Sequence, residues 1–191
     1  MNTGLLNPNH RILIVDDNPA IHEDFRKILC PARPGKSEVQ DLKAALFDTA
    51  RKAATTADFE LVSAMQGQEG LEFVKQAFAE GCPFAMAFLD VRMPPGWDGV
   101  ETAARLWQVC PDLQIVICTA YSDYSWDEMR ARLDQPDSLV ILKKPFDNVE
   151  VQQLAHAMTK KWLLSHQARL KLSQLESMVA KRTHEVPFVF V

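Results

Sequence analysis

The chain has 191 residues, of which 47% are hydrophobic and 24% are charged, as is ordinary for a soluble globular protein. This length accommodates one full-sized domain with its own core, plus an appendage. The formal net charge of -4 argues against direct nucleic-acid binding through bulk electrostatics. No segment has the apolar length of a membrane span and the N-terminus lacks a secretory-signal layout, so we expect a cytoplasmic protein with no membrane partner.

Five short apolar runs recur along the chain, and helical patterns separate them. Runs that are apolar on both faces favour central strands of a parallel sheet covered by helices. The strands are expected at residues 12–15, 59–65, 84–89, 113–118 and 139–142. Helices are expected between them at residues 19–29, 68–79, 100–109 and 123–133, the last being more polar. This alternation predicts right-handed βαβ crossovers and an open, doubly wound α/β sheet.

The helical spacing also predicts which side chains face the sheet. For the first helix these are Ile21, Phe25, Ile28 and Leu29, and for the second they are Leu71, Val74 and Phe78. The four cysteines are scattered without a CxxC spacing, so we expect small, mostly buried hydrophobic residues and no zinc site or disulfide framework. They are Cys30, Cys82, Cys110 and Cys118.

Residues 31–58 form an insertion, because the chain between the first two expected strands is longer than a βα unit of this fold needs. The insertion opens with prolines and a glycine, and it continues into a helical pattern at residues 38–54. We interpret it as an added surface helix after the first helix. Two interpretations stay open, a passive elaboration and a regulatory contact.

A long helix is expected from residue 148 to about residue 182, since this stretch has no proline or glycine. Its apolar residues follow a 3-4 repeat that resembles a coiled coil, with interruptions at Lys161 and Ser165. The members of the repeat are Val151, Leu154, Met158, Ala168, Leu172, Leu175 and Val179. The alternative is one final helix packing on the sheet, and both hold if the first half docks and the second half pairs. His156, His166 and His184 are expected to be exposed surface residues.

Polar side chains follow the ends of four expected strands: Asp16, Asp17, Asp90, Thr119 and Lys144. In an open α/β sheet, function collects beyond these carboxyl ends. Three converging carboxylates repel one another, and a divalent cation such as Mg²⁺ resolves that conflict. Each element alone has a bland interpretation as a cap or a turn residue. Together they predict phosphoryl chemistry on an aspartate.

The remaining groups of this cluster suit the transfer of a phosphoryl group to Asp90. Lys144 supplies a positive charge and Thr119 a hydroxyl donor for phosphoryl oxygens. The Lys144-Pro145 bond suits a rigid turn, for which a cis peptide bond is one option.

At this point the sequence resembles the response regulator receiver family of two-component signalling over about residues 10–155. The motifs that carry the resemblance are Ile12-Leu13-Ile14-Val15-Asp16-Asp17-Asn18-Pro19, Leu89-Asp90-Val91-Arg92-Met93-Pro94, Asp98-Gly99, Cys118-Thr119-Ala120 and Lys144-Pro145-Phe146. The resemblance implies a flavodoxin-like sheet with strand order 2-1-3-4-5. It also divides the chain into a receiver domain at 10–155, a coiled-coil-like signalling helix at 156–184 and a tail at 185–191.

By this resemblance Asp90 is the phosphoacceptor, and Thr119 and Lys144 contact the phosphate and take part in switching. The Mg²⁺ ligands would be Asp17 directly, Asp16 through water, Asp90, and the main-chain carbonyl of Arg92. The implied partners are a sensor histidine kinase or phosphotransfer protein, a downstream effector module in the same or another chain, and a second copy bound through the C-terminal helix.

Two departures from the family pattern concern the relay of the signal. Ile141 stands where family members place an aromatic residue that couples to the threonine, and Tyr121, Tyr124 and Trp126 are candidates to replace it. The loop after Asp90 is also one residue longer than usual.

The sequence predicts a phosphoacceptor and not an enzyme, with any dephosphorylation directed at itself. One alternative is a Mg²⁺-dependent phosphohydrolase with Asp90 as nucleophile, but Arg92 stands where such enzymes place a second, general-acid aspartate. The other alternative is a non-phosphorylated, receiver-like dimerisation scaffold, against which the intact set of polar residues argues.

Overall fold

The computed structural model describes residues 8–31, 59–120, 132–133 and 136–184, with side chains up to residue 179. Five parallel strands form one sheet in the order β2-β1-β3-β4-β5. Their bounds are β1 Arg11–Val15, β2 Glu60–Ala64, β3 Met86–Asp90, β4 Gln114–Thr119 and β5 Leu139–Lys143. The predicted α/β fold class, the doubly wound sheet and its strand order are therefore confirmed.

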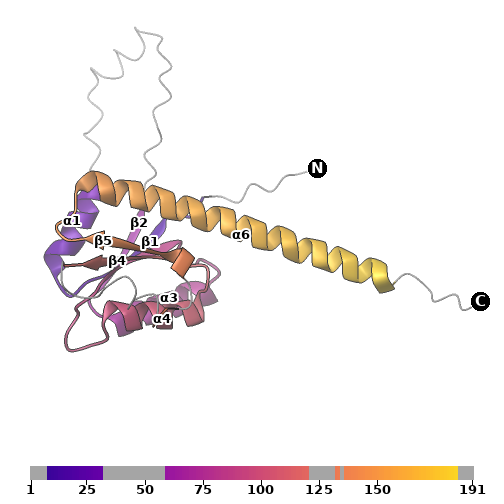
Figure 1. Ribbon diagram of the computed structural model, residues 1–191, viewed down its shortest axis with the longest axis horizontal. Helices are drawn as coiled ribbons and strands as arrows, with labels where there is room; N and C mark the ends of the chain where they lie inside the picture. The colour runs from indigo at the N-terminus through magenta and orange to yellow at the C-terminus, as the bar shows by residue number, and fades with distance from the viewer. Residues whose placement is uncertain (1–7, 32–58, 121–131, 134–135, 185–191) are drawn as a thin grey trace, which may run out of the picture.

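Within the described residues, four helices flank the sheet in two layers (Figure 1). They are α1 Pro19–Leu29, α3 Gly67–Ala79, α4 Gly99–Val109 and α6 Asn148–His184, with a short 3-10 helix η1 at Pro136–Ser138. Helices α3 and α4 cover one face, while α1 and α6 cover the other. The predicted insertion at 31–58, most of the helix expected at 123–133, and the tail at 185–191 lie outside the described residues.

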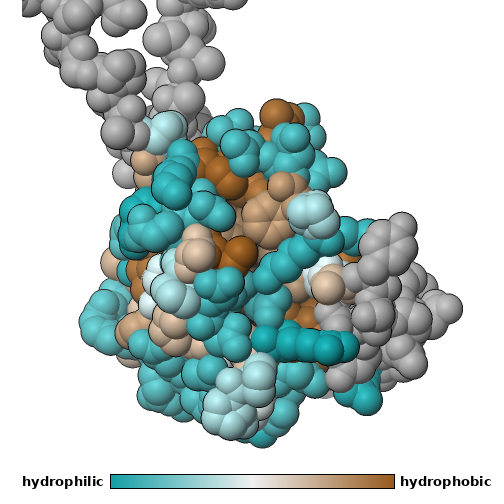
Figure 2. Space-filling model, turned by 90° about the vertical axis from the view of Figure 1, so that its left-hand side faces the viewer, coloured by the Kyte–Doolittle hydropathy of each residue, from teal (hydrophilic) through white to brown (hydrophobic). Residues whose placement is uncertain are grey.

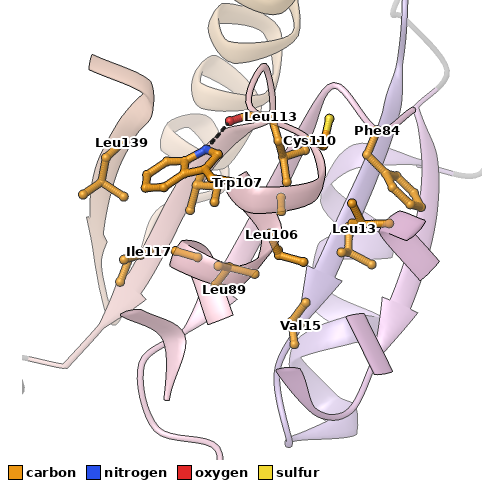
Figure 3. Close-up of a cluster of buried hydrophobic side chains, with 14 of the residues drawn as sticks. Leu13, Val15, Phe84, Leu89, Leu106, Trp107, Cys110, Leu113, Ile117 and Leu139 are labelled. Atoms are coloured by element: carbon orange, nitrogen blue, oxygen red, sulfur yellow. Dashed lines mark hydrogen bonds between the residues drawn. The ribbon is translucent and has the colours of Figure 1, made fainter. Parts of the chain in front are cut away.

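The central strands β1, β3 and β4 are buried on both faces and read as largely apolar runs, whereas the edge strands β2 and β5 are only partly buried. The larger core lies under α3 and α4, where Leu13, Leu89, Leu106 and Ile117 are inaccessible to solvent. Within it the indole Nε1 of Trp107 donates a hydrogen bond of 2.8 Å to the carbonyl of Leu113, which satisfies a buried polar group at the edge of the core (Figure 3).

Two inward faces differ from the prediction. On α1 the buried residues are His22, Phe25, Ile28 and Leu29, whereas Ile21 is only half-buried. On α3 the helix turns Val74 and Ala77 inward, and Phe78 is 53% exposed. On α1 the His22 ring lies inward because it reaches the carbonyl of Asp16, and on α3 the smaller Ala77 takes the inward place.

The cysteine prediction is right for two residues and wrong for one. All four cysteines are free; Cys110 and Cys118 are buried, Cys30 is half-buried, and Cys82 is exposed. Cys82 lies in the connection after α3, beside the positive-φ Gly81, and therefore outside the layers of the core.

Helix α6 begins on the sheet and then runs beyond it (Figure 1). Val151 and Ala155 are buried in the core shared with α1, and Trp162 and Leu163 form a small cluster with Ala85. From Leu164 on, the apolar side chains are exposed. The predicted long C-terminal helix is confirmed, and its first half docks on the body while its second half projects from it; the pairing of the second half stays a prediction.

The docked part of α6 is held at both ends by polar contacts. Gln152 donates to the carbonyl of Ile28 near the start, at 3.1 Å. At the far end Arg169 forms a two-pronged ion pair with Asp112, at 2.6 and 2.8 Å. His166 is half-buried and stacks on Trp162, so the prediction that it is an exposed histidine is wrong. None of the described helices is long and apolar enough to cross a membrane.

Candidate functional site at the carboxyl end of the sheet

The polar residues singled out in the sequence meet at one edge of the sheet. Asp16 and Asp17 directly follow β1, Asp90 ends β3, Thr119 ends β4, and Lys144 follows β5. The parallel register brings these strand ends level, with Asp90 beside Cys118 and Thr119 beside Lys143. This end of the molecule, from which α6 begins, has a mainly hydrophilic surface (Figure 2).

Lys144 is the centre of the site. Its Nζ donates to Asp16 Oδ2 at 2.8 Å and to Asp90 Oδ1 at 2.7 Å. The side chain of Lys144 is 24% exposed, while those of Asp16 and Asp90 are 4% and 14% exposed. The Lys144-Pro145 peptide bond is cis. One ammonium thus bridges two carboxylates that solvent barely screens, so their mutual interactions are stronger than on an open surface.

The carboxylate of Asp90 is fixed in orientation. Besides the bond from Lys144 to Oδ1, its Oδ2 accepts a hydrogen bond of 3.0 Å from the backbone amide of Arg92. Each oxygen therefore has a donor, and the plane of the group is defined by two different elements of the chain. A fixed, partly accessible carboxylate is what a positioned nucleophile requires.

Asp16 is held by residues that the sequence reasoning did not assign to the site. Its Oδ1 accepts from the backbone amide of Asn18 at 2.9 Å. Its carbonyl lies 2.8 Å from Nε2 of the buried His22, and because a carbonyl only accepts, Nε2 carries the proton. The spacing of His22, Phe25 and Leu29 on α1 indicates that they share one face of the helix. Hydrophobic periodicity alone did not identify His22 as an inward residue, because its side chain is polar.

The three aspartates offer oxygen ligands for a hard cation. One ligand atom each from Asp16, Asp17 and Asp90 lies within 4.8 Å of the others. Three carboxylates against one ammonium leave an excess of negative charge, and an all-oxygen donor set suits Mg²⁺. The residues present thus fit the predicted ion. Arg92 contacts Asp90 through its amide, and the role of its carbonyl as a ligand stays a prediction.

Thr119 lies beside this cluster in a buried position. Its side chain is 5% exposed, and its Oγ1 donates to the carbonyl of Ala120 at 2.9 Å. Ile141, which stands in place of an aromatic residue, is half-buried and packs against the larger core. The candidates to replace that aromatic residue, Tyr121, Tyr124 and Trp126, lie outside the described residues.

The Asp98-Gly99 pair positions the loop that carries the site. Asp98 caps α4 by accepting from the amide of Glu101 at 2.7 Å. Gly99 donates its amide to the carbonyl of Val91 at 3.0 Å. A Cβ at Gly99 would lie 2.3 Å from the carbonyl oxygen of Asp90, so a side chain has no room there. The absence of that side chain lets the start of α4 pack directly against the backbone of Asp90.

Charge and burial act against each other on Asp90 and Lys144. Burial raises the pKa of the Asp90 carboxyl above its ordinary value; the hydrogen bond from Lys144 opposes this without cancelling it, and Asp16 adds repulsion. Burial disfavours the ammonium of Lys144, but its hydrogen bonds to Asp16 and Asp90 outweigh burial and raise the pKa of Lys144. The site therefore favours the charged form of Lys144 and disfavours the ionised form of Asp90.

We therefore expect Asp90→Asn to stabilise the metal-free protein at pH 7, by about 1 kcal/mol, as is common when a function-bearing charge is removed. Because the pKa of Asp90 is higher in the folded than in the unfolded chain, the folded state binds more protons between those two values. The contribution of Asp90 to the free energy of unfolding therefore falls as pH rises between these two pKa values. The stability advantage of Asp90→Asn over the wild type grows over the same pH range.

Urea unfolding in EDTA between pH 4.5 and 7.5 measures this difference in the free energy of unfolding. Asp24→Asn, which removes an exposed carboxylate on α1, serves as the control and should change stability by less than about 0.5 kcal/mol. Equal or lower stability of Asp90→Asn at pH 7 contradicts the prediction.

Comparison with known proteins agrees with this fold. Residues 39–156, more than half of the chain, match the model of the response regulator receiver domain, so the chain belongs to that family. No curated protein matches the sequence. The match begins after Asp16 and Asp17, which the structure brings to the same edge of the sheet as Asp90.

Solved structures support the fold at low sequence identity. An adenylate cyclase from Rhodopirellula baltica is similar with a TM-score of 0.63 and 20% identity, covering 86% of this chain and 98% of that chain. A signal receiver domain of an HD domain-containing protein from Pseudomonas fluorescens Pf-5 has a TM-score of 0.60 and 15% identity, covering 87% and 98%. A CheY-like response regulator receiver domain protein from Methanospirillum hungatei JF-1 has a TM-score of 0.51 and 19% identity, covering 79% of this chain and 94% of that chain.

Proposed function

We propose that this receiver domain accepts a phosphoryl group on Asp90 from a phosphohistidine of a sensor histidine kinase or phosphotransfer protein. The observation that carries the proposal is the ammonium of Lys144 set between Asp16 and Asp90, at 2.8 and 2.7 Å, with Asp17 alongside. A structural ion pair needs one carboxylate. A third acidic group at the same edge is explained by a site that binds further positive charge.

The transfer forms one bond and breaks another. An Asp90 carboxylate oxygen attacks phosphorus, the P–N bond breaks, and the departing imidazole nitrogen takes up a proton, which leaves an acyl phosphate on Asp90. Lys144 provides a cation for the phosphoryl oxygens, and the Thr119 hydroxyl is a second donor once it turns from the carbonyl of Ala120. Bound Mg²⁺, held by Asp16, Asp17, Asp90 and the Arg92 carbonyl, would neutralise phosphoryl charge.

The output of this event is proposed to pass through α6, which starts four residues after Lys144. Its docked half packs on the same sheet that carries the site, and its exposed half suits self-association. We propose that phosphorylation changes the conformation or dimerisation of the chain and thereby controls an effector module in the same or another chain.

The phosphoacceptor proposal is tested by incubating the protein with acetyl phosphate and Mg²⁺ and measuring the intact mass. The wild type and Asp24→Asn, a matched aspartate change on α1, should each gain one phosphate. Asp90→Asn should gain none, and EDTA should abolish the gain. No gain in the wild type, or an equal gain in Asp90→Asn, would refute the proposal and favour the scaffold role.

A similar incubation, with an aryl phosphate in place of acetyl phosphate, distinguishes a phosphoacceptor from a phosphohydrolase. Arg92 occupies the position where an aspartate general acid would be required for turnover of phosphoesters. With the aryl phosphate, phosphate release should therefore not exceed about one equivalent per protein chain. Sustained turnover that depends on Asp90 would instead identify an enzyme.

A further inference from the structure

The side chains of one apolar stripe on α6 are packed against the core at the start of the helix and exposed to solvent towards its end. Its first members, Val151, Leu154 and Met158, belong to or pack against the protein's own core. Its later members form the C-terminal seam, which we define as Ser165, Ala168, Leu172, Leu175 and Val179. In that seam Leu172 is 60%, Leu175 54% and Val179 65% exposed. Three large aliphatic side chains exposed on one helix face indicate an interface.

In the part of the chain that the structure describes, the body leaves this seam exposed. Trp162, His166 and Arg169 mark the side of α6 that contacts the body. At 100° per residue, the centre of the seam lies roughly 100° round the helix from that side. The helix also runs on past its last anchor at Arg169 (Figure 1). The seam is therefore open to a second helix along its length.

The 3-4 spacing of the seam identifies the shape of the occupant. Members separated alternately by three and four residues make the a and d positions of a heptad, with Ser165, Leu172 and Val179 at a and Ala168 and Leu175 at d. Such a seam packs against another helix of the same kind. A second copy of this chain supplies one.

The charges beside the seam decide the direction of the partner. Lys171 occupies the g position and Glu176 the e position of the next heptad. In a parallel, in-register pair, g of one helix meets the following e of its partner, so Lys171 meets the partner's Glu176 and the reverse pair forms as well. Opposite charges at this spacing favour the parallel arrangement on both sides of the seam.

An antiparallel pair of helices would not form these ion pairs. There e faces e and g faces g, so Lys171 meets no acidic residue. Glu176 would have to use Arg169, which is already paired with Asp112 of its own chain at 2.6 Å. Charge complementarity therefore selects one of the two directions.

We infer that the C-terminal seam pairs with a second copy of this chain as a parallel, in-register two-stranded coiled coil flanked by two reciprocal Lys171–Glu176 ion pairs. This inference rests on the self-association proposed above and is independent of the phosphoacceptor role of Asp90. The two receiver bodies lie side by side at the start of the coiled coil, and both helix ends lie together at the other end.

Charge reversal in the full chain tests the arrangement by sedimentation velocity, with and without acetyl phosphate and Mg²⁺. Lys171→Glu and Glu176→Lys should each raise the dimer dissociation constant about tenfold, because two attractive pairs become repulsive in each homodimer. An equimolar mixture of the two variants should recover the wild-type constant, since both pairs are attractive in the mixed dimer. Lys160→Glu, an equal charge change away from the seam, should have no effect.

The outcomes separate this inference from the functional proposal. A wild-type protein that stays monomeric in both phosphorylation states overturns the dimer, while the mass measurement on Asp90 still decides the acceptor role. A dimer that Leu172→Lys disrupts but Lys171→Glu leaves unchanged overturns the parallel register. Weakening by both single reversals and recovery in the mixture support it.

Discussion

Replacing Lys144 with methionine is expected to slow phosphorylation of Asp90 by acetyl phosphate about 10²–10³-fold, the usual cost of losing one positioned donor for transition-state charge. Lys144 Nζ lies 2.7 Å from Asp90 Oδ1, so it is within reach of an oxygen attached to the incoming phosphorus. Methionine keeps an unbranched apolar stem but removes the charge. The rate of mass gain under saturating Mg²⁺ measures the effect.

The same substitution should act in the opposite direction on metal affinity. Without the ammonium, the repulsion among Asp16, Asp17 and Asp90 is uncompensated, so Mg²⁺ is expected to bind Lys144→Met more tightly than the wild type. Tryptophan fluorescence or calorimetry during Mg²⁺ titration measures this. Lys143→Met, the adjacent exposed lysine on β5, is the control. A phosphorylation rate within threefold of the wild type would contradict the assigned role of Lys144.

Gly99→Ala is expected to destabilise the protein by about 3 kcal/mol, the upper range for forcing extra volume into a packed site. The new methyl group would lie 2.3 Å from the Asp90 carbonyl oxygen and 3.1 Å from Val91 Cα, all of it backbone that cannot rotate away. Relief requires moving the start of α4 or the end of β3. Since β3 ends in Asp90, we also expect slower phosphorylation of the folded variant.

Gly96→Ala is the matched control for this prediction, because it lies in the same loop and also has close neighbours. There the atoms that a Cβ would meet are the side-chain ends of Gln66 and Gln68, which can turn aside. Its free energy of unfolding should stay within about 0.5 kcal/mol of the wild type, measured by urea unfolding. Equal stability of Gly99→Ala and the wild type would show that the loop accommodates a side chain.

The strands and the site residues were predictable because they depend on short-range patterns. The central strands are apolar on both faces, and the parallel order brings all strand ends to one edge, so Asp16, Asp90 and Lys144 had to converge once the topology was right. The predicted strand bounds differ from the observed ones by at most two residues. Such ends depend on hydrogen bonds between strands, which a single segment does not encode.

The helix faces were less predictable, since burial there depends on available volume. His22 is inward because its ring reaches the Asp16 carbonyl, a tertiary contact that hydrophobic periodicity cannot express. Phe78 follows the apolar pattern of α3 but is exposed at its end, and the smaller Ala77 takes the inward place. His166 was also misassigned, because stacking on Trp162 depends on how α6 docks.

The unbroken course of α6 has a mechanical consequence. Among the described residues, the ion pair between Arg169 and Asp112 is the last ion pair that holds α6 to the body. The 15 residues beyond Arg169 in α6 form a lever of about 22 Å, without a proline or glycine at which it could bend. A tilt of about 10° at this pivot sweeps the far tip by about 4 Å, so a small rearrangement beneath the docked segment becomes a displacement the size of a side chain where the helix ends.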